Sequence, residues 1–347
     1  MTTNAANNDE LNHGATREMP WAWHPNLPIE NAPVFSWPLR PLVAVKYVVS
    51  RIILEPLYLI IFLFSVFTWL WLVRSIESWQ IFSADWILQI FVINLSLVVF
   101  VAGGLHLYFY TFKTQHGDRQ FDTTGINQKS HKFFANNQCL DNIFWTCASG
   151  VPIWSAYQVI LMWSYATPGL RWIEWSGNPV WFVILLVAIP LWQSFHFYWI
   201  HRFLHWKPLY KLAHSVHHRN INIGPWTGIS MHPIEHALYF SSVFIHLVVP
   251  SHPIHIFFHM YFSALGAIAG HSGFESIRIW GKSILRTGDF FHQLHHRYFD
   301  CNYGTADIPL DKWFDSFHDG TPERTITIRQ HQMQLRGITA GNRQSPY

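Results

Sequence analysis

Two short stretches of the chain carry histidines whose number and spacing are typical of metal ligands. The stretches hold three groups, H-R-F-L-H, H-S-V-H-H and H-Q-L-H-H. Residues three and four apart share one face of a helix, so short helices would present these imidazoles to a common point. Neutral imidazole is the commonest protein ligand for iron, zinc and copper. The spacing therefore predicts a metal site formed by His201, His205, His214, His217, His218, His292, His295 and His296.

The number of histidines indicates more than one ion. Eight imidazoles exceed the roughly four to six ligands that one ion takes, so we expect two ions. Hydrolytic sites with two metals usually include bridging carboxylates, and the three groups contain none. Histidines brought together only by packing are the alternative, and repeated H-x-x-H-H groups make it the weaker one.

The three groups, with R-Y-F-D-C-N-Y-G after the last, resemble the fatty acid hydroxylase and sterol desaturase superfamily from about Ser194 to Gly320. Members are integral-membrane di-iron oxygenases. The resemblance implies two iron ions, dioxygen, and hydroxylation or desaturation of a sterol-like or long-chain lipid in lipid biosynthesis. It does not separate these two reactions or these two substrates. The chain departs from the family at Ser194 and His196, where an aspartate is common, and at His318, where a glycine often follows the phenylalanine.

Three further histidines are included in the predicted ligand set. His232 and His236 are four residues apart in M-H-P-I-E-H, and the His-Pro pair resembles a recurrent family feature. His271, in G-H-S-G-F-E, stands where family members often place a further ligand. Glu275, four residues later, is a candidate to bind metal or to orient a ligand. We expect no ligation by His246, His252, His255 and His259.

The composition predicts an integral membrane protein. Half of the 347 residues are hydrophobic, 17% are aromatic and only 12% are charged, about half of the charge usual in soluble domains. The net charge of +3 gives no reason to expect nucleic acid binding. Three cysteines at unrelated spacings, Cys139, Cys147 and Cys301, form neither a disulfide framework nor a zinc motif.

Four uncharged segments are long enough to cross about 30 Å of hydrocarbon: 56–73, 86–112, 142–170 and 176–200. The predicted fold is therefore all-α, with about four transmembrane helices. The stretch 237–274 is interrupted by Pro250 and Pro253, which indicates a hairpin inserted in the membrane. The predicted organisation is a polar and proline-rich segment (1–42), transmembrane helices (43–200), a catalytic region with a cytoplasmic histidine-rich helical cap (194–320) and a polar tail (321–347).

Lysine and arginine placement predicts the orientation. Cations collect before the first span, in the 113–141 loop and among the histidines, so these parts are expected in the cytoplasm. The expected location is the endoplasmic reticulum membrane or a bacterial inner membrane, with no cleavable signal peptide. No haem-binding His-Pro-Gly-Gly segment occurs. Electrons would then come from a separate donor, of the cytochrome b5 or ferredoxin type, docking near Arg202, Lys207 and Arg219.

Other classes of protein remain as alternatives. A histidine-rich metal transporter or sensor would need ligands inside the spans, whereas these groups lie beyond the span ends. A b-type cytochrome would need isolated histidines in mid-span, not an adjacent pair such as His217 and His218. A family member with an aldehyde-processing or dehydratase activity is also open.

Overall fold

The computed structural model of the protein describes residues 21–72, 76–126, 130–168 and 172–335. The first 20 residues of the predicted N-terminal segment and the last 12 of the predicted tail lie outside these ranges. So do Lys129, one of the cations of the 113–141 loop, and Arg74 and Arg171, which are the single cations of the loops 74–85 and 171–175 expected on the opposite side of the membrane.

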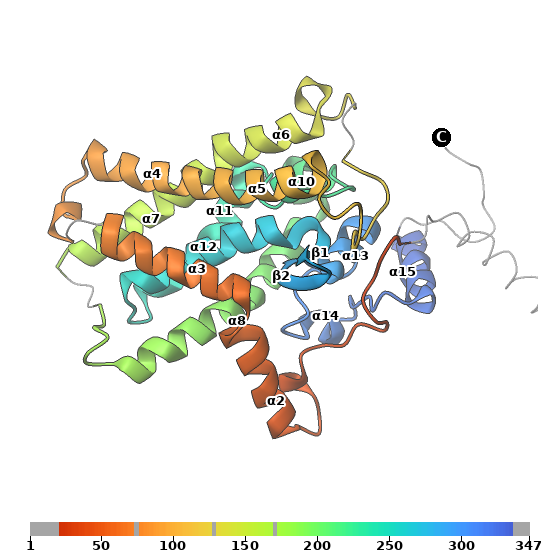
Figure 1. Ribbon diagram of the computed structural model, residues 1–347, viewed down its shortest axis with the longest axis horizontal. Helices are drawn as coiled ribbons and strands as arrows, with labels where there is room; N and C mark the ends of the chain where they lie inside the picture. The colour runs from red at the N-terminus through yellow and green to blue at the C-terminus, as the bar shows by residue number, and fades with distance from the viewer. Residues whose placement is uncertain (1–20, 73–75, 127–129, 169–171, 336–347) are drawn as a thin grey trace, which may run out of the picture.

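The described chain is mostly helical, and short 3-10 or π-helical segments, labelled η, join many of the α-helices (Figure 1). Its N-terminal half contains η1 (Pro33–Phe35), α2 (Pro41–Val48), η2 (Val49–Ile53), α3 (Pro56–Phe67), η3 (Thr68–Leu72), η4 (Glu77–Trp79), α4 (Ala84–Val98), η5 (Val99–Gly103), α5 (Gly104–His106), η6 (Leu107–Thr111), η7 (Phe134–Asn136), α6 (Gln138–Trp145), η8 (Thr146–Gly150) and α7 (Val151–Ala166).

The C-terminal half begins with the longest helix and carries all the predicted metal ligands. Its elements are α8 (Pro179–Leu204), α9 (Lys207–Leu209), η9 (Tyr210–His214), α10 (Ser215–His218), η10 (Pro225–Thr227), α11 (Pro233–Phe240), η11 (Ser241–Leu247), α12 (Pro253–Gly270), β1 (His271–Ile279), β2 (Lys282–Gly288), α13 (Phe290–Tyr298), α14 (Leu310–Trp313) and α15 (Pro322–Leu335). Thus α15 makes a helix of much of the predicted polar tail.

Within the described ranges, three helices are long and apolar enough to cross a membrane, Ala84–Thr111, Pro179–Leu204 and Pro253–Gly270. A fourth span is possible if Pro41–Ile53 and Pro56–Leu70, bent by 48° at their junction, count as one. The expectation of about four membrane helices is therefore confirmed. Three of the four predicted segments correspond to these helices or to the second arm of the bent pair.

The predicted span 142–170 is not among the described helices that are long and apolar enough to cross a membrane. Its helix, α6 through α7, carries no charge beyond Asp141, yet its buried face holds Asn142, Thr146, Ser149 and Gln158. It packs against α4, α11 and α12 within the bundle. An uncharged segment can therefore be a buried helix that is less apolar than a membrane-spanning helix facing lipid.

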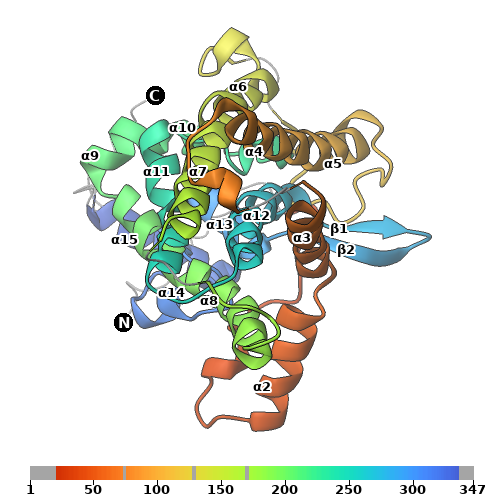
Figure 2. The ribbon, with the colours of Figure 1, turned by 90° about the vertical axis from the view of Figure 1, so that its left-hand side faces the viewer.

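The predicted hairpin is present, with α11 and η11 as one arm and α12 as the other. Buried residues make up 72% of the most apolar window of α12, which packs against α3, α7 and α8 in the middle of the bundle (Figure 2). After α12 the chain forms an antiparallel pair, β1 and β2. Its two-residue turn, Trp280 and Gly281, has positive φ at both positions, as a tight hairpin requires. The all-α prediction missed this hairpin.

The main helices run side by side, and the metal-ligand elements gather at one end (Figure 1). Helices α10 and α13 lie at that end, together with the β-hairpin and the cation-bearing chain after η6. The turns before α4, before α8 and before α12 lie at the opposite end. All three histidine groups therefore lie at the same end of the bundle. The two arms of the α11–α12 hairpin bring the chain back to that end.

Residues 21–32 form an extended strap across this end of the molecule. The Ala22 amide donates to the Phe121 carbonyl at 3.0 Å, the Ile29 amide to Asp319 at 2.9 Å, and the Ala32 amide to Ala306 at 3.1 Å. The sequence predicted only a polar and proline-rich segment here, without a position relative to the predicted ligands. The strap closes one side of the cavity that leads to the histidines.

Candidate metal centre

Nine histidines converge on two neighbouring points. The first group contains His201, His205, His214, His218 and His295, and the second contains His217, His271, His292 and His296. Within each group, the candidate ligand atoms all lie within 4.8 Å of one another. Both groups consist of histidine alone, and all members except the half-buried His205 are buried.

Contacts between ring nitrogens match a shared cation in each group. Nε2 of His218 lies 3.0 Å from Nε2 of His295 in the first group. In the second, Nε2 of His271 lies 3.1 Å from Nε2 of both His292 and His296. Two nitrogens bound at right angles, each about 2.1 Å from a metal ion, lie about 3 Å apart. The spacing therefore fits two imidazoles on one ion.

The opposite ring nitrogen of most of these histidines is already held by the protein. Six donate from Nδ1 to a carbonyl or carboxylate oxygen, which leaves the Nε2 lone pair free to bind metal. The pairs are His201 to Tyr303 O at 2.7 Å, His214 to Glu235 Oε1 at 2.8 Å, His217 to Ser230 O at 3.3 Å, His271 to Ala267 O at 2.8 Å, His295 to Cys301 O at 2.6 Å and His296 to Asn220 O at 3.1 Å.

In the described part of the chain, three ring nitrogens of the first group are buried without a hydrogen-bond partner, Nε2 of His201, Nε2 of His214 and Nδ1 of His218. An unpaired buried nitrogen is costly, and a metal ion would remove that cost at the two Nε2 atoms. The donor set therefore fits two ions of the kind that imidazole prefers, iron, zinc or copper.

Local sequence explains how the elements position the ligands. Helix α13 begins where the Asp289 carboxylate accepts from the Phe291 amide at 2.9 Å, a typical N-cap. The H-Q-L-H-H spacing then places His292, His295 and His296 on its buried face. His271 is the first residue of β1, directly after α12, so the centre joins α8, η9, α10, the start of β1 and α13.

Gly228 allows the loop that supports His217 to approach α12 closely. A Cβ at this position would lie 2.5 Å from the Ala267 carbonyl oxygen, well inside van der Waals contact. The same loop carries Ser230, whose carbonyl accepts from His217. Only glycine fits here without moving the backbone of one of the two segments.

Asp311 organises the loop after α13, a role that its sequence position did not reveal. The buried carboxylate accepts from the Tyr303 and Gly304 amides, both at 2.8 Å, and from Ser316 Oγ at 2.6 Å. The loop in turn offers the carbonyls of Cys301 and Tyr303 to His295 and His201. Asp311 therefore orients two candidate ligands without touching them.

Glu235 was also missed, although it lies between two predicted ligands in M-H-P-I-E-H. The residue is 2% exposed, and Oε1 accepts from His214 Nδ1 at 2.8 Å. A carboxylate behind a metal-binding histidine fixes the ring and raises its basicity. A carboxylate two residues beyond a helix-capping His-Pro pair is the signal that could have found it.

The structure does not bring His232 and His236 to either group. His232 caps α11, accepting from the Ile234 amide at 3.3 Å. Both nitrogens of His236 are occupied, by Ser149 Oγ at 2.9 Å and the Ile229 carbonyl at 3.0 Å. Glu275 lies 3.6 Å from Arg119 and belongs to neither group. His236 thus supports the fold around the centre.

His246, His252, His255 and His259 of the hairpin lie outside both groups, and all four are buried. His246 Nε2 is 3.1 Å from His259 Nδ1, and His255 contacts the Phe182 carbonyl at 2.9 Å. At the two departures from the family, Ser194 lines the cavity and His318 accepts from the Gly320 amide at 3.0 Å.

Burial keeps the candidate ligands neutral. Loss of water lowers the pKa of His217 to about 3 and that of His271 to about 4, because the charged imidazolium is disfavoured in an apolar setting. The same cause lowers the pKa of His295 and His296. Neutral imidazole is the form that binds metal.

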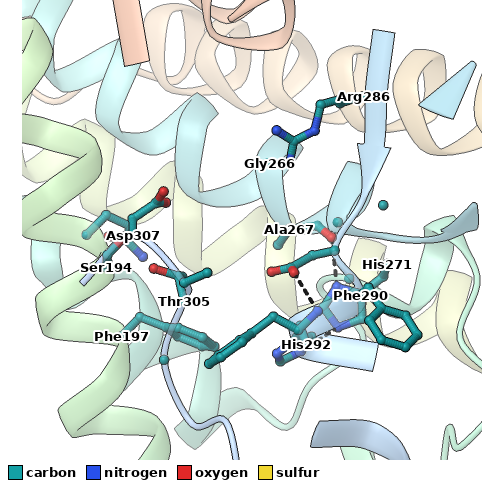
Figure 3. A pocket seen from close by; sticks show the side chains of 18 of the residues that line it. Ser194, Phe197, Gly266, Ala267, His271, Arg286, Phe290, His292, Thr305 and Asp307 are labelled. Carbon is teal, nitrogen blue, oxygen red and sulfur yellow. Dashed lines mark hydrogen bonds between the residues drawn. The ribbon is translucent and has the colours of Figure 1, made fainter. Parts of the chain in front are cut away.

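A cavity of about 500 Å³ reaches the histidines from the side of α2 and the strap. Figure 3 draws His271 and His292 on one side of it and Ser194, Thr305 and Asp307 on the other. The Phe197 ring lies 6.0 Å from the His292 ring. The cavity is also lined by Phe197, Ile200 and Leu204 of α8 and by Gly266, Ala267 and Gly270 of α12.

Comparison with known proteins places this site in a family. Residues 186–316 match the fatty acid hydroxylase family, and this range includes all nine clustered histidines. This part of the chain is therefore similar to the fatty acid hydroxylase family, as its histidine groups predicted.

Relatives include several sterol-modifying enzymes. A Delta(7)-sterol 5(6)-desaturase of Gibberella zeae is 30% identical over 41% of this chain and 44% of its own length. A Delta(7)-sterol-C5(6)-desaturase of Nicotiana tabacum is 28% identical over 52% and 64% of the two chains, and methylsterol monooxygenase 1 of Gallus gallus 28% over 47% and 55%. The chain spans about half the length of the curated relatives it matches. No solved structure matches it significantly.

Proposed function

We propose that this protein is a membrane-bound di-iron oxidoreductase that uses dioxygen to hydroxylate or desaturate a sterol-like lipid. The observation that carries the proposal is the pair of all-histidine groups at the inner end of a cavity with an apolar middle. The relatives with sterol desaturase and methylsterol monooxygenase names support the substrate class.

The nine clustered histidines are the proposed ligands, five for one ion and four for the other. Two bound iron ions would supply the reduction of dioxygen and the removal of a hydrogen atom from an unactivated C–H bond. His232 and His236 remain in the family motif as groups that shape the loop between α10 and α11, and we do not assign them to either ion.

Protein groups would prepare this chemistry in three ways. Carbonyl oxygens and Glu235 hold the Nδ1 protons of six of the nine rings, so these rings keep one tautomer and one orientation. Phe197, Ile200 and Leu204 exclude water from the reacting carbon. Gly266, Ala267 and Gly270 leave a smooth, wide wall on α12, which suits a fused ring system.

Electrons would come from a separate donor of the cytochrome b5 or ferredoxin type, on the cytoplasmic side. Arg202 lies 5.7 Å above the ring of Tyr303, and the carbonyl of Tyr303 contacts His201. A donor bound at Arg202 would therefore be connected to the first histidine group through Arg202 and Tyr303. The endoplasmic reticulum membrane or a bacterial inner membrane is the proposed location.

Labelled dioxygen tests the proposal. The protein is expressed with an electron donor in a host that makes sterols, ¹⁸O₂ is supplied, and lipid extracts are compared by mass spectrometry with those of a His217→Ala variant. Hydroxylation adds one labelled oxygen atom, and desaturation gives a product two mass units lighter. A lipid profile identical to that of the variant, with metal loaded, would refute the proposal and favour metal transport or a non-oxidative reaction.

A further inference from the structure

The outer end of the cavity carries a set of charged and polar groups that the metal centre does not use. Tyr47 Oη donates to Asp307 Oδ1 at 2.6 Å, and Arg286 lies 3.9 Å from Glu55. Arg51 stands near enough to Asp307 to act on its charge. We call these five residues, Tyr47, Arg51, Glu55, Arg286 and Asp307, the outer polar cluster; all line the cavity.

The five residues of the outer polar cluster include equal numbers of cationic and carboxyl groups, and other carboxyl groups of the cavity, among them those of Glu30 and Asp289, lie outside the cluster. The cluster contains two guanidinium groups and two carboxyl groups, with Glu55 buried and both arginines exposed at the opening. Deeper in, Thr305 Oγ1 also lines the cavity and is buried without a hydrogen-bond partner among the described residues. A neutral ligand group that both donates and accepts hydrogen bonds would satisfy these atoms.

We propose that the outer polar cluster and Thr305 bind the hydroxyl group of a lipid alcohol, whose apolar body extends between α8 and α12 toward the histidines. The inference rests on the proposed function and names the polar end of its substrate. It assigns a binding role to Tyr47, Arg51 and Glu55, which lie outside the region matched to the family.

Other head groups fit less well for electrostatic reasons. An anionic head such as a carboxylate, sulfate or phosphate would meet Asp307 and Glu55, and burial already raises the pKa of Asp307 because added negative charge is unfavourable there. A cationic amine would meet Arg51 and Arg286. A hydroxyl adds no charge and can donate to a carboxylate, a bond stronger than a neutral one.

One lipid can reach both ends of the cavity. Asp307 follows Tyr303 by four residues, and the Tyr303 carbonyl contacts His201 at 2.7 Å. A chain of four residues spans at most about 14 Å. The hydroxyl at Asp307 and the oxidised carbon near the histidines are thus separated by no more than the length of one lipid molecule.

Competition binding to the metal-loaded, detergent-purified protein tests the inference without turnover. Tritiated cholesterol is displaced by unlabelled cholesterol, cholesterol methyl ether or cholesterol sulfate, and tritiated octadecanol by octadecanol or octadecanoate. We expect the alcohol to compete at least tenfold better than the ether, the sulfate or the acid in whichever series binds. Equal or better competition by the sulfate or the acid, or no binding in either series, would overturn the inference.

Two substitutions locate the site. Asp307→Asn and Tyr47→Phe should each weaken binding of the alcohol about tenfold and raise KM while kcat and metal content stay near wild type. Asp315→Asn is the matched control, because Asp315 is an exposed carboxylate paired with Arg324 at 3.0 Å. Unchanged alcohol affinity in both variants, with the fold intact by circular dichroism, would contradict the assignment.

Failure of the inference and failure of the proposed function are distinguishable. A preference for the alcohol in binding, with no ¹⁸O or mass change in any lipid, would retain the subsite and reject the oxidase. Lipid oxidation with a preference for the acid would retain the oxidase and reject the subsite.

Discussion

Removing the charge of Glu235 should weaken one of the two metal sites and leave the other intact. Glu235 Oε1 accepts from His214 Nδ1 at 2.8 Å, in a setting where the residue is 2% exposed. Burial raises the pKa of this carboxyl group, whereas a cation bound to His214 favours its charged form. In the metal-loaded protein the hydrogen bond therefore involves a charged group and contributes about 1.5–3 kcal/mol. Glu235→Gln keeps an acceptor at the same place but removes the charge, so only part of that energy is lost.

The expected magnitude follows from that partial loss. About 1.4 kcal/mol corresponds to a tenfold change in a dissociation constant, so Glu235→Gln should weaken the first group's affinity about tenfold. Glu235→Ala, which leaves His214 Nδ1 without a partner, should weaken it by about 10- to 100-fold. The second group, whose members do not contact Glu235, should keep its affinity.

Metal titration against a competing chelator measures both sites. Apo-protein in detergent is titrated with Co²⁺ as a spectroscopic probe and with Fe²⁺ under anaerobic conditions. The matched control is Glu275→Gln, which removes another carboxylate of the cavity, one that lies 3.6 Å from Arg119 and in neither histidine group. Two sites of wild-type affinity in Glu235→Ala, or equal weakening in Glu275→Gln, would refute the reasoning.

Three further predictions use the cavity, the loop and the buried imidazoles. Gly266→Phe should abolish lipid turnover with metal content unchanged, since a Cβ there meets nothing within 4 Å and points into the cavity; Gly104→Phe, on an exposed face of α5 with equal room, should retain activity, and loss in both would count against the cavity. Gly228→Ala should destabilise the protein by about 1–3 kcal/mol, seen as a lower melting temperature, and an unchanged melting temperature would contradict the close approach to α12. Burial lowers the pKa of His217 to about 3 from an ordinary 6.5, so the unfolded chain binds more protons than the folded chain below pH 6.5. The free energy of unfolding of the metal-free protein should therefore fall as pH falls, by about 2 kcal/mol at pH 5 for this residue. Bound metal should leave only as the protein unfolds, and release of metal from a folded protein at pH 6 would show that the site is exposed.

Spacing alone located most of the centre, because helical periodicity and imidazole chemistry are both local properties. The same argument included His232 and His236, which have the spacing of ligands. Their rings turn away because a cap and two hydrogen bonds, from Ser149 and the Ile229 carbonyl, occupy their nitrogens. These partners lie far along the chain or depend on the loop conformation, so periodicity does not report them.

Other features depended on tertiary packing. The supporting role of Asp311 depends on loops that meet in space and has no spacing signature of its own, whereas the place of Glu235 just after a His-Pro pair was a local signal that the analysis of histidine spacing passed over. The segment 142–170 is free of charge inside its span, yet it packs within the bundle through Asn142 and Gln158. The β-hairpin is stabilised by its two-residue turn at Trp280 and Gly281, which an analysis of apolar runs overlooks.

The most direct test of the account is the metal content of the purified protein. Detergent-purified protein, reconstituted anaerobically with Fe²⁺, is analysed for metals by mass spectrometry and by its optical spectrum. We predict two iron ions per chain and no Soret band, and a fall to one or fewer in His217→Ala and in His295→Ala, which represent the two groups. A single zinc ion per chain, a haem spectrum, or two irons retained in both variants would contradict the account.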